Sequence, residues 1–367
     1  MGRSDLALSR NGPPEAGRAW EAWEAPAAPV SRVALRFGEG MSREAFMNFS
    51  AATRIDDTLF LAADEGVDID RLLIDAEGCG DHQCVRLGDL LPLANAAKEA
   101  DLEGLAADDG WLWVVGSHAR TRAKPEKARG ECIDLLTLAD LKDTRPRCLL
   151  ARLPLVADGG CWRPVAQEGE RRAGMLRQRG RGNALADALR RDPLVGPFTK
   201  VPAKEGGVDV EGIAVCGDRV ALGMRGPVVA GHALLIEVRV EAKKSGRLKL
   251  AGGPVLRLLA LDGLGVRDLK RDGDDLLILA GPTTGLDGPC ALHRWRGWAQ
   301  DPPQDARKVR LHRPERVLDL PFGRGEDHPE GLALWGDGRV LVIHDSPAAG
   351  RLAGGAGTIA ADLFEMP

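Results

Sequence analysis

One pattern recurs five times along the chain and limits the folds that it can adopt. Each copy has a short apolar run, a polar turn that contains Asp and in four copies also Gly, and a strongly apolar second run, as in LEGLAADDGWLWVV (102–115) and VEGIAVCGDRVALGM (210–224). Asp-Gly and Gly-Asp between two β-rich runs signal a β-hairpin. The second run lacks a clean polar alternation, which predicts a strand that is covered on both faces.

The spacing of the copies predicts a β-propeller. They start at residues 48, 101, 209, 265 and 328, so three intervals are 53, 56 and 63 residues, and the remaining one is 108. Repeats of about 40–55 residues with about four strands each are typical of propeller blades. We therefore expect an all-β fold of five four-stranded blades. A sixth, degenerate blade in the long interval is the alternative.

Further strands are expected outside the hairpins. Apolar runs at 69–75, 130–138, 232–240 and 290–298 fit third strands, and those at 147–153 and 254–261 fit outer strands. The run SRVALRF at 31–37 has no hairpin of its own. We expect it to complete the last blade, which would remove an exposed sheet edge.

The domain organisation follows from the repeat. Residues 1–29 are rich in Ala, Pro, Glu and Arg, which predicts a disordered tail, and residues 30–367 form a single propeller domain. We expect an insertion at about 154–208, because GNALADALRRD (182–192) has helical apolar spacing and a Pro follows it.

The charge, the cysteines and the lack of a long apolar run argue against a nucleic-acid-binding, disulfide-rich or membrane-spanning protein. A formal net charge of −4 predicts no general attraction to nucleic acid or to an acidic membrane. The seven cysteines lack the dense spacing of a disulfide scaffold, and no apolar run reaches the roughly 18 residues of a membrane span. We expect a cytoplasmic protein with free thiols.

The hairpin geometry gathers ionisable residues at one place. The start of the first strand and the end of the second lie at the same end of a hairpin, so inner hairpins would direct these residues to one mouth of the central channel. The candidate metal ligands are Glu65, Glu103, Glu211, Glu330 and Asp345, the candidate anion-binding residues are Arg120, Arg225 and Arg267, and the candidate acid–base residues are His118 and His344.

Two interpretations of this charged ring remain open. In one, the Glu and Arg side chains pair and clamp neighbouring blades, each buried charge being neutralised by its neighbour. In the other, they form a ligand or metal site. Carboxylate oxygens suit calcium or magnesium, and guanidinium groups suit an anionic ligand.

Other motifs carry weaker signals. Cys79, His82 and Cys84 are close in sequence but lack the second ligand pair of a zinc site. The Arg-rich stretch 171–183 has no interleaved aromatic residues for base stacking, so we expect a solvated loop.

The repeated stretches resemble a bacterial family named domain of unknown function 3616. The stretches are SAATRIDDTLFLAADE, EADLEGLAADDGWLWVVGSHART, DVEGIAVCGDRVALGMRGPVVAGHALLIEV, GVRDLKRDGDDLLILAGP and HPEGLALWGDGRVLVIHDSP. They lie in family order between residues 48 and 347. The family is distantly similar to propellers with esterase-like or phytase-like activity, which implies ester or phosphoester hydrolysis.

We therefore expect a propeller that binds a small anionic ligand at the channel mouth, with calcium or magnesium as the candidate cofactor. Metal-dependent hydrolysis, with His118 or His344 in acid–base roles, is the enzymatic hypothesis. A non-enzymatic scaffold that holds a protein partner is the alternative.

Overall fold

The computed structural model describes residues 26–38, 47–64, 66–93, 100–122, 135–142, 144–302, 308–355 and 357–367. Most of the predicted tail and the predicted metal ligand Glu65 lie outside these residues. The five expected hairpins are present as β2 (Phe49–Ile55) with β3 (Thr58–Ala63), β6 (Leu102–Asp108) with β7 (Trp111–Gly116), β13 (Asp209–Cys216) with β14 (Arg219–Gly226), β18 (Gly265–Asp272) with β19 (Asp275–Gly281), and β23 (His328–Gly336) with β24 (Arg339–Asp345).

Each hairpin continues outward into a larger antiparallel sheet. The outer strands, by sheet, are β4 (Asp68–Asp75) and β5 (Gly78–Arg86); β8 (Leu150–Asp158) and β12 (Gly174–Met175); β15 (Ala233–Ala242) and β17 (Val255–Leu259); β20 (Cys290–Trp295) and β22 (Glu315–Leu320); and β25 (Thr358–Glu365) and β1 (Ser31–Arg36). The remaining strands are β9 (Cys161–Pro164) on β8, β16 (Leu248–Leu250) on β15, β21 (Arg310–His312) parallel to β17, and the separate pair β10 (Gln167–Glu168) and β11 (Arg171–Arg172).

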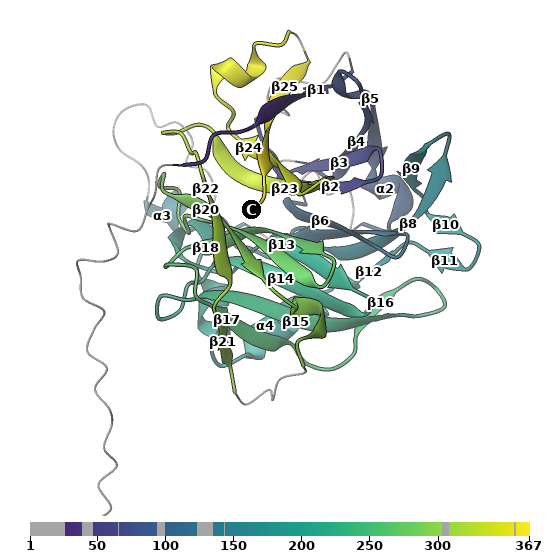
Figure 1. Ribbon diagram of the computed structural model, residues 1–367. Helices are drawn as coiled ribbons and strands as arrows, with labels where there is room; N and C mark the ends of the chain where they lie inside the picture. The colour runs from purple at the N-terminus through teal and green to yellow at the C-terminus, as the bar shows by residue number, and fades with distance from the viewer. Residues whose placement is uncertain are drawn as a thin grey trace, which may run out of the picture.

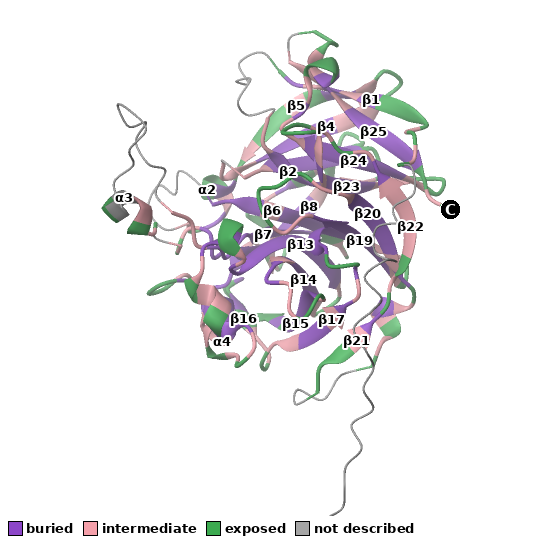
Figure 2. Cartoon of the chain, turned by 90° about the vertical axis from the view of Figure 1, so that its left-hand side faces the viewer, coloured by how far each residue is buried: buried purple, intermediate pink, exposed green. Residues whose placement is uncertain are grey.

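The inner strands form a closed ring. β2 contacts β6, β6 contacts β13, β13 contacts β18, β18 contacts β23, and β23 contacts β2. Figure 1 shows these five strands near the middle of the molecule, with the other strands outside them. Buried residues are concentrated in strands such as β13, β14, β23 and β24 (Figure 2). The fold is all-β and propeller-like, as the repeat predicted.

The N-terminal strand completes the last sheet, as expected for residues 31–37. β1 pairs with β25 along its whole length, from Ser31 opposite Leu363 to Arg36 opposite Thr358. One parallel bridge, Leu35 to Cys79, also joins β1 to β5 of the first sheet. The first and last sheets therefore share one hydrogen-bonded path, β2-β3-β4-β5-β1-β25-β24-β23.

One predicted strand is wrong. The described part of 130–138 is not a strand, because residues Leu135–Ala139 form the short helix α3. The strand beside β7 is β8, which begins within the run that we expected to be an outer strand. The sequence LLTLA holds mostly strong helix formers and has one β-branched residue, so its apolar content alone did not identify a strand.

The region 154–208 contains more than one kind of element. Its first part includes most of β8 and strands β9 to β12, and its second part holds the expected helix, α4 (Ala184–Arg191), followed by the 3-10 turns η1 (Gly196–Lys200) and η2 (Ala203–Glu205). The Asn183 side chain accepts a hydrogen bond from the Ala186 amide and so caps α4. The other short helices are α2 (Leu87–Leu90), η3 (Trp298–Gln300) and η4 (Ala349–Leu352).

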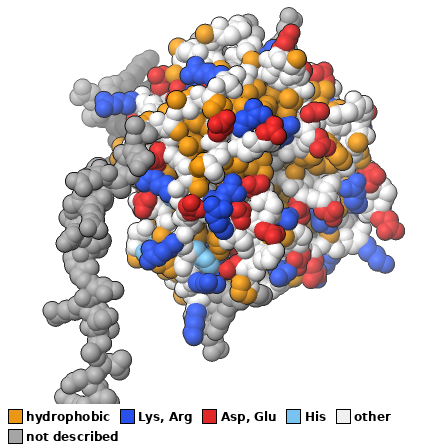
Figure 3. All heavy atoms as spheres, viewed as in Figure 1, with side chains coloured by type: hydrophobic (Ala, Val, Ile, Leu, Met, Phe, Trp, Pro, Cys, Tyr) orange, Lys and Arg blue, Asp and Glu red, His pale blue; other side chains and the backbone are white. Residues whose placement is uncertain are grey.

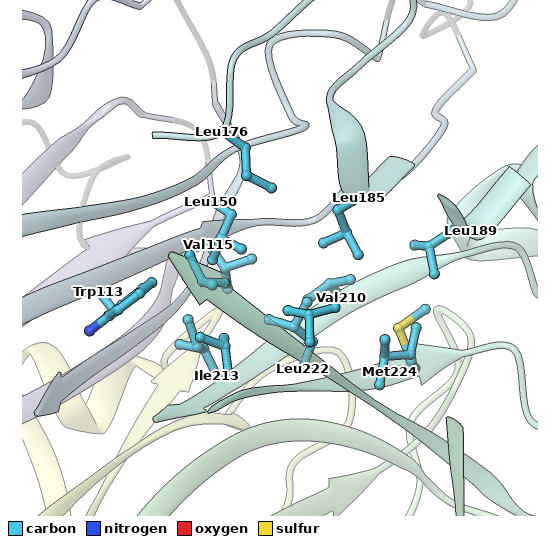
Figure 4. Packing of buried hydrophobic residues seen from close by; sticks show 14 of the residues in the cluster. Trp113, Val115, Leu150, Leu176, Leu185, Leu189, Val210, Ile213, Leu222 and Met224 are labelled. Atoms are coloured by element: carbon cyan, nitrogen blue, oxygen red, sulfur yellow. The ribbon is translucent and has the colours of Figure 1, made fainter. Parts of the chain in front are cut away.

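The helix α4 is held by the apolar core between the second and third sheets. Leu185 and Leu189 of α4 pack with Val210 and Met224 of the third hairpin in a single buried cluster (Figure 4). No helix among the described residues is long and apolar enough to cross a membrane. On the surface, acidic and basic side chains are interspersed over the face seen in Figure 3.

Candidate functional site at the channel mouth

A β-bulge interrupts all five hairpins near the start of the first strand. In each hairpin, one residue near the start of the inner strand has no partner in the register of the second strand. An extra residue of this kind bends the strand and changes the direction of its side chain. The five bulge residues are Ser50, Glu103, Glu211, Arg267 and Glu330. All three Glu residues of the Glu-Gly motifs are therefore bulge residues.

The glycine after two of these Glu residues allows neighbouring inner strands to approach closely. A Cβ atom on Gly104 would lie 2.9 Å from a side-chain carbon of Ile213 on the next inner strand. A Cβ atom on Gly212 would lie 2.8 Å from the backbone nitrogen of Leu269, again on the next inner strand. In the Glu-Gly motif, the bulge therefore changes the direction of the Glu side chain, and the Gly that follows lets the neighbouring strand approach closely.

Polar contacts link other neighbouring inner strands. The Ser50 hydroxyl on β2 donates to the Leu102 carbonyl on β6, at 2.5 Å. The Leu332 amide on β23 donates to the fully buried Asp268 carboxylate on β18, at 2.7 Å, and Lys270 also pairs with this carboxylate at 2.6 Å. Burial raises the pKa of Asp268 to about 6, against the attraction of Lys270. Asp268 therefore connects two sheets and does not face the mouth as an open ligand.

The mouth of the ring contains a small, strongly acidic cavity of about 110 Å³, which we call the inner cavity. Seven carboxylates and three basic side chains line it. The acidic residues are Asp64, Asp101, Glu103, Asp209, Glu211, Glu330 and Asp345, and the basic ones are Arg147, Lys204 and Arg225.

Two arginines neutralise most of the carboxylates on one side of the ring. Arg267 pairs with Glu211 on one neighbouring strand, at 3.2 Å, and with Glu330 on the other. Arg225 pairs with Glu211, at 2.8 Å, and with Asp209. The Arg267 pairs link neighbouring inner strands, as in the first interpretation of the charged ring, in which Glu–Arg pairs clamp the blades.

Glu103 lies on the other side of the ring, where the flanking bulge residues are Ser50 and Glu211. In the described part of the chain, no Lys, Arg or His lies within ion-pairing distance of its carboxylate, whereas the nearby Asp101 pairs with Arg147. Burial, and then repulsion from Asp101 and Glu211, raise the pKa of Glu103 well above its usual value. A bound positive charge would relieve this repulsion.

A second cavity of about 250 Å³, the outer cavity, adjoins the inner one. His328 lies in its wall, with Nε2 2.9 Å from Asp287 and Nδ1 3.8 Å from Asp345. The carboxylates of Asp345 and Asp287 raise the pKa of His328. The two cavities share four lining residues, Lys204, Arg225, Glu330 and Asp345.

The structure does not bring His118 into either cavity. The His118 ring is buried, its Nδ1 is 2.9 Å from the Gly116 carbonyl oxygen, and its Nε2 is 3.2 Å from the Asn183 amide nitrogen. Because the carbonyl only accepts, Nδ1 carries the proton and Nε2 accepts from Asn183. Burial lowers the pKa of His118 to about 4, so the ring is neutral at pH 7 and holds the turn before α4 in place.

The structure also directs His344 away from the mouth. Its Nε2 lies 3.2 Å from Arg351, which pairs in turn with Asp362 on β25 at 2.7 Å. Burial, and then the charge of Arg351, lower the pKa of His344 to about 4. Arg120 does not line either cavity, whereas Asp345, directly after His344, lines both.

Several lining residues were not singled out from the sequence. Asp209 and His328 stand at the first position of their strands, and the same hairpin-end argument that selected Glu211 and Glu330 places them at the mouth. Lys204 lies on η2, in the region expected to be an insertion, and no local pattern marks it.

The carboxylates at the mouth are not arranged as a metal site within the described residues. Nowhere in that part of the chain do three or more His, Cys, Asp or Glu side chains group in a way that could hold a metal ion. Glu211 and Glu330 are engaged by Arg267, which leaves Glu103 and Asp345 as the predicted ligands without an arginine partner among the described residues.

The match to known families covers most of the chain. A family model described as "Protein of unknown function (DUF3616)" matches residues 48–362. The chain belongs to the DUF3616 family. This confirms the resemblance drawn from the five repeated stretches. Among curated proteins, none matches this DUF3616 protein.

Some solved structures resemble the DUF3616 protein at low identity. Glutaminyl cyclase of Myxococcus xanthus is 12% identical, with a TM-score of 0.39 over 93% of this chain and 100% of that one. The Cps50 (Swd1) β-propeller domain of Myceliophteria thermophila is 9% identical, with a TM-score of 0.34 over 92% of this chain and 98% of that one. Likenesses this weak carry no argument about activity.

Proposed function

We propose that this protein is a five-bladed propeller that binds a small ligand through its positive charge at the inner cavity. The observation that carries the proposal is Glu103, a carboxylate at the mouth with no cationic partner in the described part of the chain. The closed ring of five hairpins supports the blade count, and the β1–β25 pairing supports closure of the last blade.

The charge of the inner cavity favours a cation over a free anion. Seven carboxylates against three basic side chains leave an excess of negative charge, and the arginines are already paired with carboxylates. A fully anionic ligand, as expected from the sequence, would meet repulsion here. A cation would gain from the repulsion that now raises the pKa of Glu103.

An organic ammonium group fits the described residues better than a metal ion. Calcium and magnesium need about six or more oxygens at short, defined distances. No such group of three or more protein ligands is arranged among the described residues. An ammonium group needs only acceptors for its three N–H donors, which Glu103 and neighbouring carboxylates can supply.

We propose binding without turnover. The two histidines chosen for proton transfer, His118 and His344, lie outside both cavities, and each has a pKa of about 4. A ligand-binding role needs neither of them. It also needs no protein partner, which separates it from the scaffold hypothesis.

Calorimetric titration of the purified protein with n-butylamine, calcium chloride and magnesium chloride tests the proposal. Because the pKa of Glu103 is raised in the empty site and a bound ammonium favours the ionised carboxylate, amine binding should tighten as the pH is raised. Glu103→Gln should weaken amine binding by about tenfold or more, since a hydrogen bond to a charged group is lost. Glu241→Gln, an exposed change that removes a surface pair with Lys249, is the matched control.

The outcomes separate the possibilities. If neither the amine nor either metal binds, the proposal is wrong. If only a metal binds, and Glu103→Gln abolishes that binding, the site holds the divalent cation expected from the sequence, and the ammonium proposal is overturned.

A further inference from the structure

Glu103 and Lys204, two side chains of opposite charge at the mouth, each lack an ion-pair partner among the described residues. We infer that the natural ligand is a zwitterion of the amino-acid class, with its ammonium group at Glu103 in the inner cavity and its carboxylate at Lys204. This inference rests on the proposed function, because it takes the cationic end of the ligand from there. It adds the anionic end, the body of the ligand and the residue that selects it.

Lys204 is the basic residue of the mouth that has no partner in the described part of the chain. Arg147, Arg225 and Arg267 all pair with carboxylates, whereas no hydrogen bond or ion pair involves the Lys204 ammonium within the described ranges. Lys204 lines both cavities. It is therefore placed to receive a negative group from a ligand that extends out of the inner cavity.

The backbone that carries Lys204 is fixed, although its side chain is exposed. Lys204 is the central residue of η2, and the Ala203 amide donates to the Arg120 carbonyl at 2.9 Å. Arg122 also pairs with Glu205 on the same turn. A lysine on an anchored turn loses only side-chain freedom when it binds a carboxylate.

The outer cavity provides an apolar surface for the body of the ligand. Leu286, which is 77% exposed, and Phe322, which is 43% exposed, both line it. Large apolar side chains with this exposure are uncommon in the described part of the protein, and two of them lie at one cavity. An apolar part of the ligand that extends into the outer cavity would cover them.

A zwitterion satisfies both ends without adding net charge to the mouth. An amine alone leaves Lys204 unpaired, and a carboxylate alone meets the acidic inner cavity. We therefore expect the affinity to fall in the order amino acid, amine, carboxylate. The chain length of the ligand sets which amino acid can reach both groups.

The experiment compares ω-amino acids, from glycine to 6-aminohexanoate, with n-alkylamines of the same chain length. Titration of the full-length protein should identify at least one amino acid that binds about tenfold or more tightly than its matched amine, as expected for one charge-assisted hydrogen bond. Lys204→Met should abolish that gain without weakening amine binding, because the amine has no anionic group to place at Lys204. Lys243→Met, an exposed change on another loop, is the control and should have no effect.

Failure of this inference is distinguishable from failure of the proposed function. If amines bind through Glu103 but no amino acid binds more tightly, or Lys204→Met leaves the gain intact, the inference is overturned and the proposed function stands. An equal loss of amine and amino-acid affinity in Lys204→Met also overturns it. If no amine binds at all, both are overturned.

Discussion

Replacing Glu211 with glutamine should destabilise the protein, whereas the same change at Glu103 should not. The two residues occupy equivalent bulges, and the substitution changes one atom type in each. They differ in their surroundings, because Glu211 lies between Arg225 and Arg267, whereas no cation of the described chain lies within ion-pairing distance of Glu103. The pair of variants therefore tests whether the equivalent positions have different roles.

The magnitude for Glu211 follows from its burial and its two partners. Its residue exposure is 4%, and its two oxygens lie 2.8 Å from Arg225 and 3.2 Å from Arg267. Removing one charge from a buried pair costs about 3–5 kcal/mol. With an unfolding entropy of about 2 cal/mol/K per residue over 367 residues, such a loss lowers Tm by about 4–7 °C.

At neutral and alkaline pH, the change in stability caused by Glu103→Gln should have the opposite sign to that caused by Glu211→Gln. Its pKa is raised in the folded protein, so the wild type loses stability as pH rises from the unfolded-state value of about 4.3 towards the folded-state value. Glutamine does not titrate and avoids this loss. The Tm of Glu103→Gln should equal that of the wild type near about pH 4 and exceed it increasingly as pH rises.

Thermal unfolding followed by circular dichroism, at several pH values between about 5 and 8, measures both effects. Glu241→Gln is again the control and should change Tm little, because exposed ion pairs contribute about 0–1 kcal/mol. Equal destabilisation by Glu103→Gln and Glu211→Gln would refute the reasoning. So would a difference between Glu103→Gln and the wild type that does not change with pH.

Three further changes probe the fold. Gly212→Ala should cost about 1–3 kcal/mol in urea unfolding, because the new Cβ would lie 2.8 Å from the Leu269 nitrogen; an unchanged midpoint would contradict the close approach. Val114→Asp should abolish soluble expression, because an unpaired charge at a fully buried position of β7 costs several kcal/mol; normal yield would contradict the burial of β7 between its neighbours. Asn183→Ala should cost about 1 kcal/mol by removing the cap of α4, and it also removes a hydrogen bond to His118; unchanged stability would show that the cap contributes nothing.

The five hairpins could be predicted because their signals are local. Each turn contains Asp or Gly in the order that a tight turn requires, and each second strand is a continuous apolar run. The position of 31–37 in the last sheet was also predictable. This run had no hairpin partner in the sequence, and the last blade lacked an outer strand, so pairing the two removes an exposed edge. The sequence of 130–138 misled because an apolar run without periodicity does not distinguish a strand from a short helix.

The details of the mouth were less predictable, for physical reasons. Counting residues from the turn predicts which residues lie together at the end of a hairpin. A bulge shifts this register by one residue and changes the direction of the side chain, and the bulge residues Ser, Glu and Arg do not share one residue type. Asp345 is the last residue of β24, and His118 lies two residues beyond the end of β7. However, its backbone has a φ of 53° and Asn183, 65 residues away, binds its ring, so the ring turns from the channel. The pairing of Arg267 with both neighbouring Glu residues depends on strand order around the ring, which the spacing of the repeats implies only in outline.

The pairing of β1 with β25 has a consequence for synthesis of the protein on the ribosome. Arg32 and Asp362, which are hydrogen-bonded across this pair, are separated by 330 residues. At about 5–20 residues per second, β1 leaves the ribosome about 15–65 s before its partner strand is made. During that interval Val33 and Leu35, which are buried in the finished molecule, lack the strand that pairs with β1 along its whole length, although Cys79 of β5 can already bridge to Leu35. The nascent chain therefore has an unpaired β1 edge until its last strand emerges, and loss of β25 by premature termination would leave both β1 and β24 without the strand that joins them.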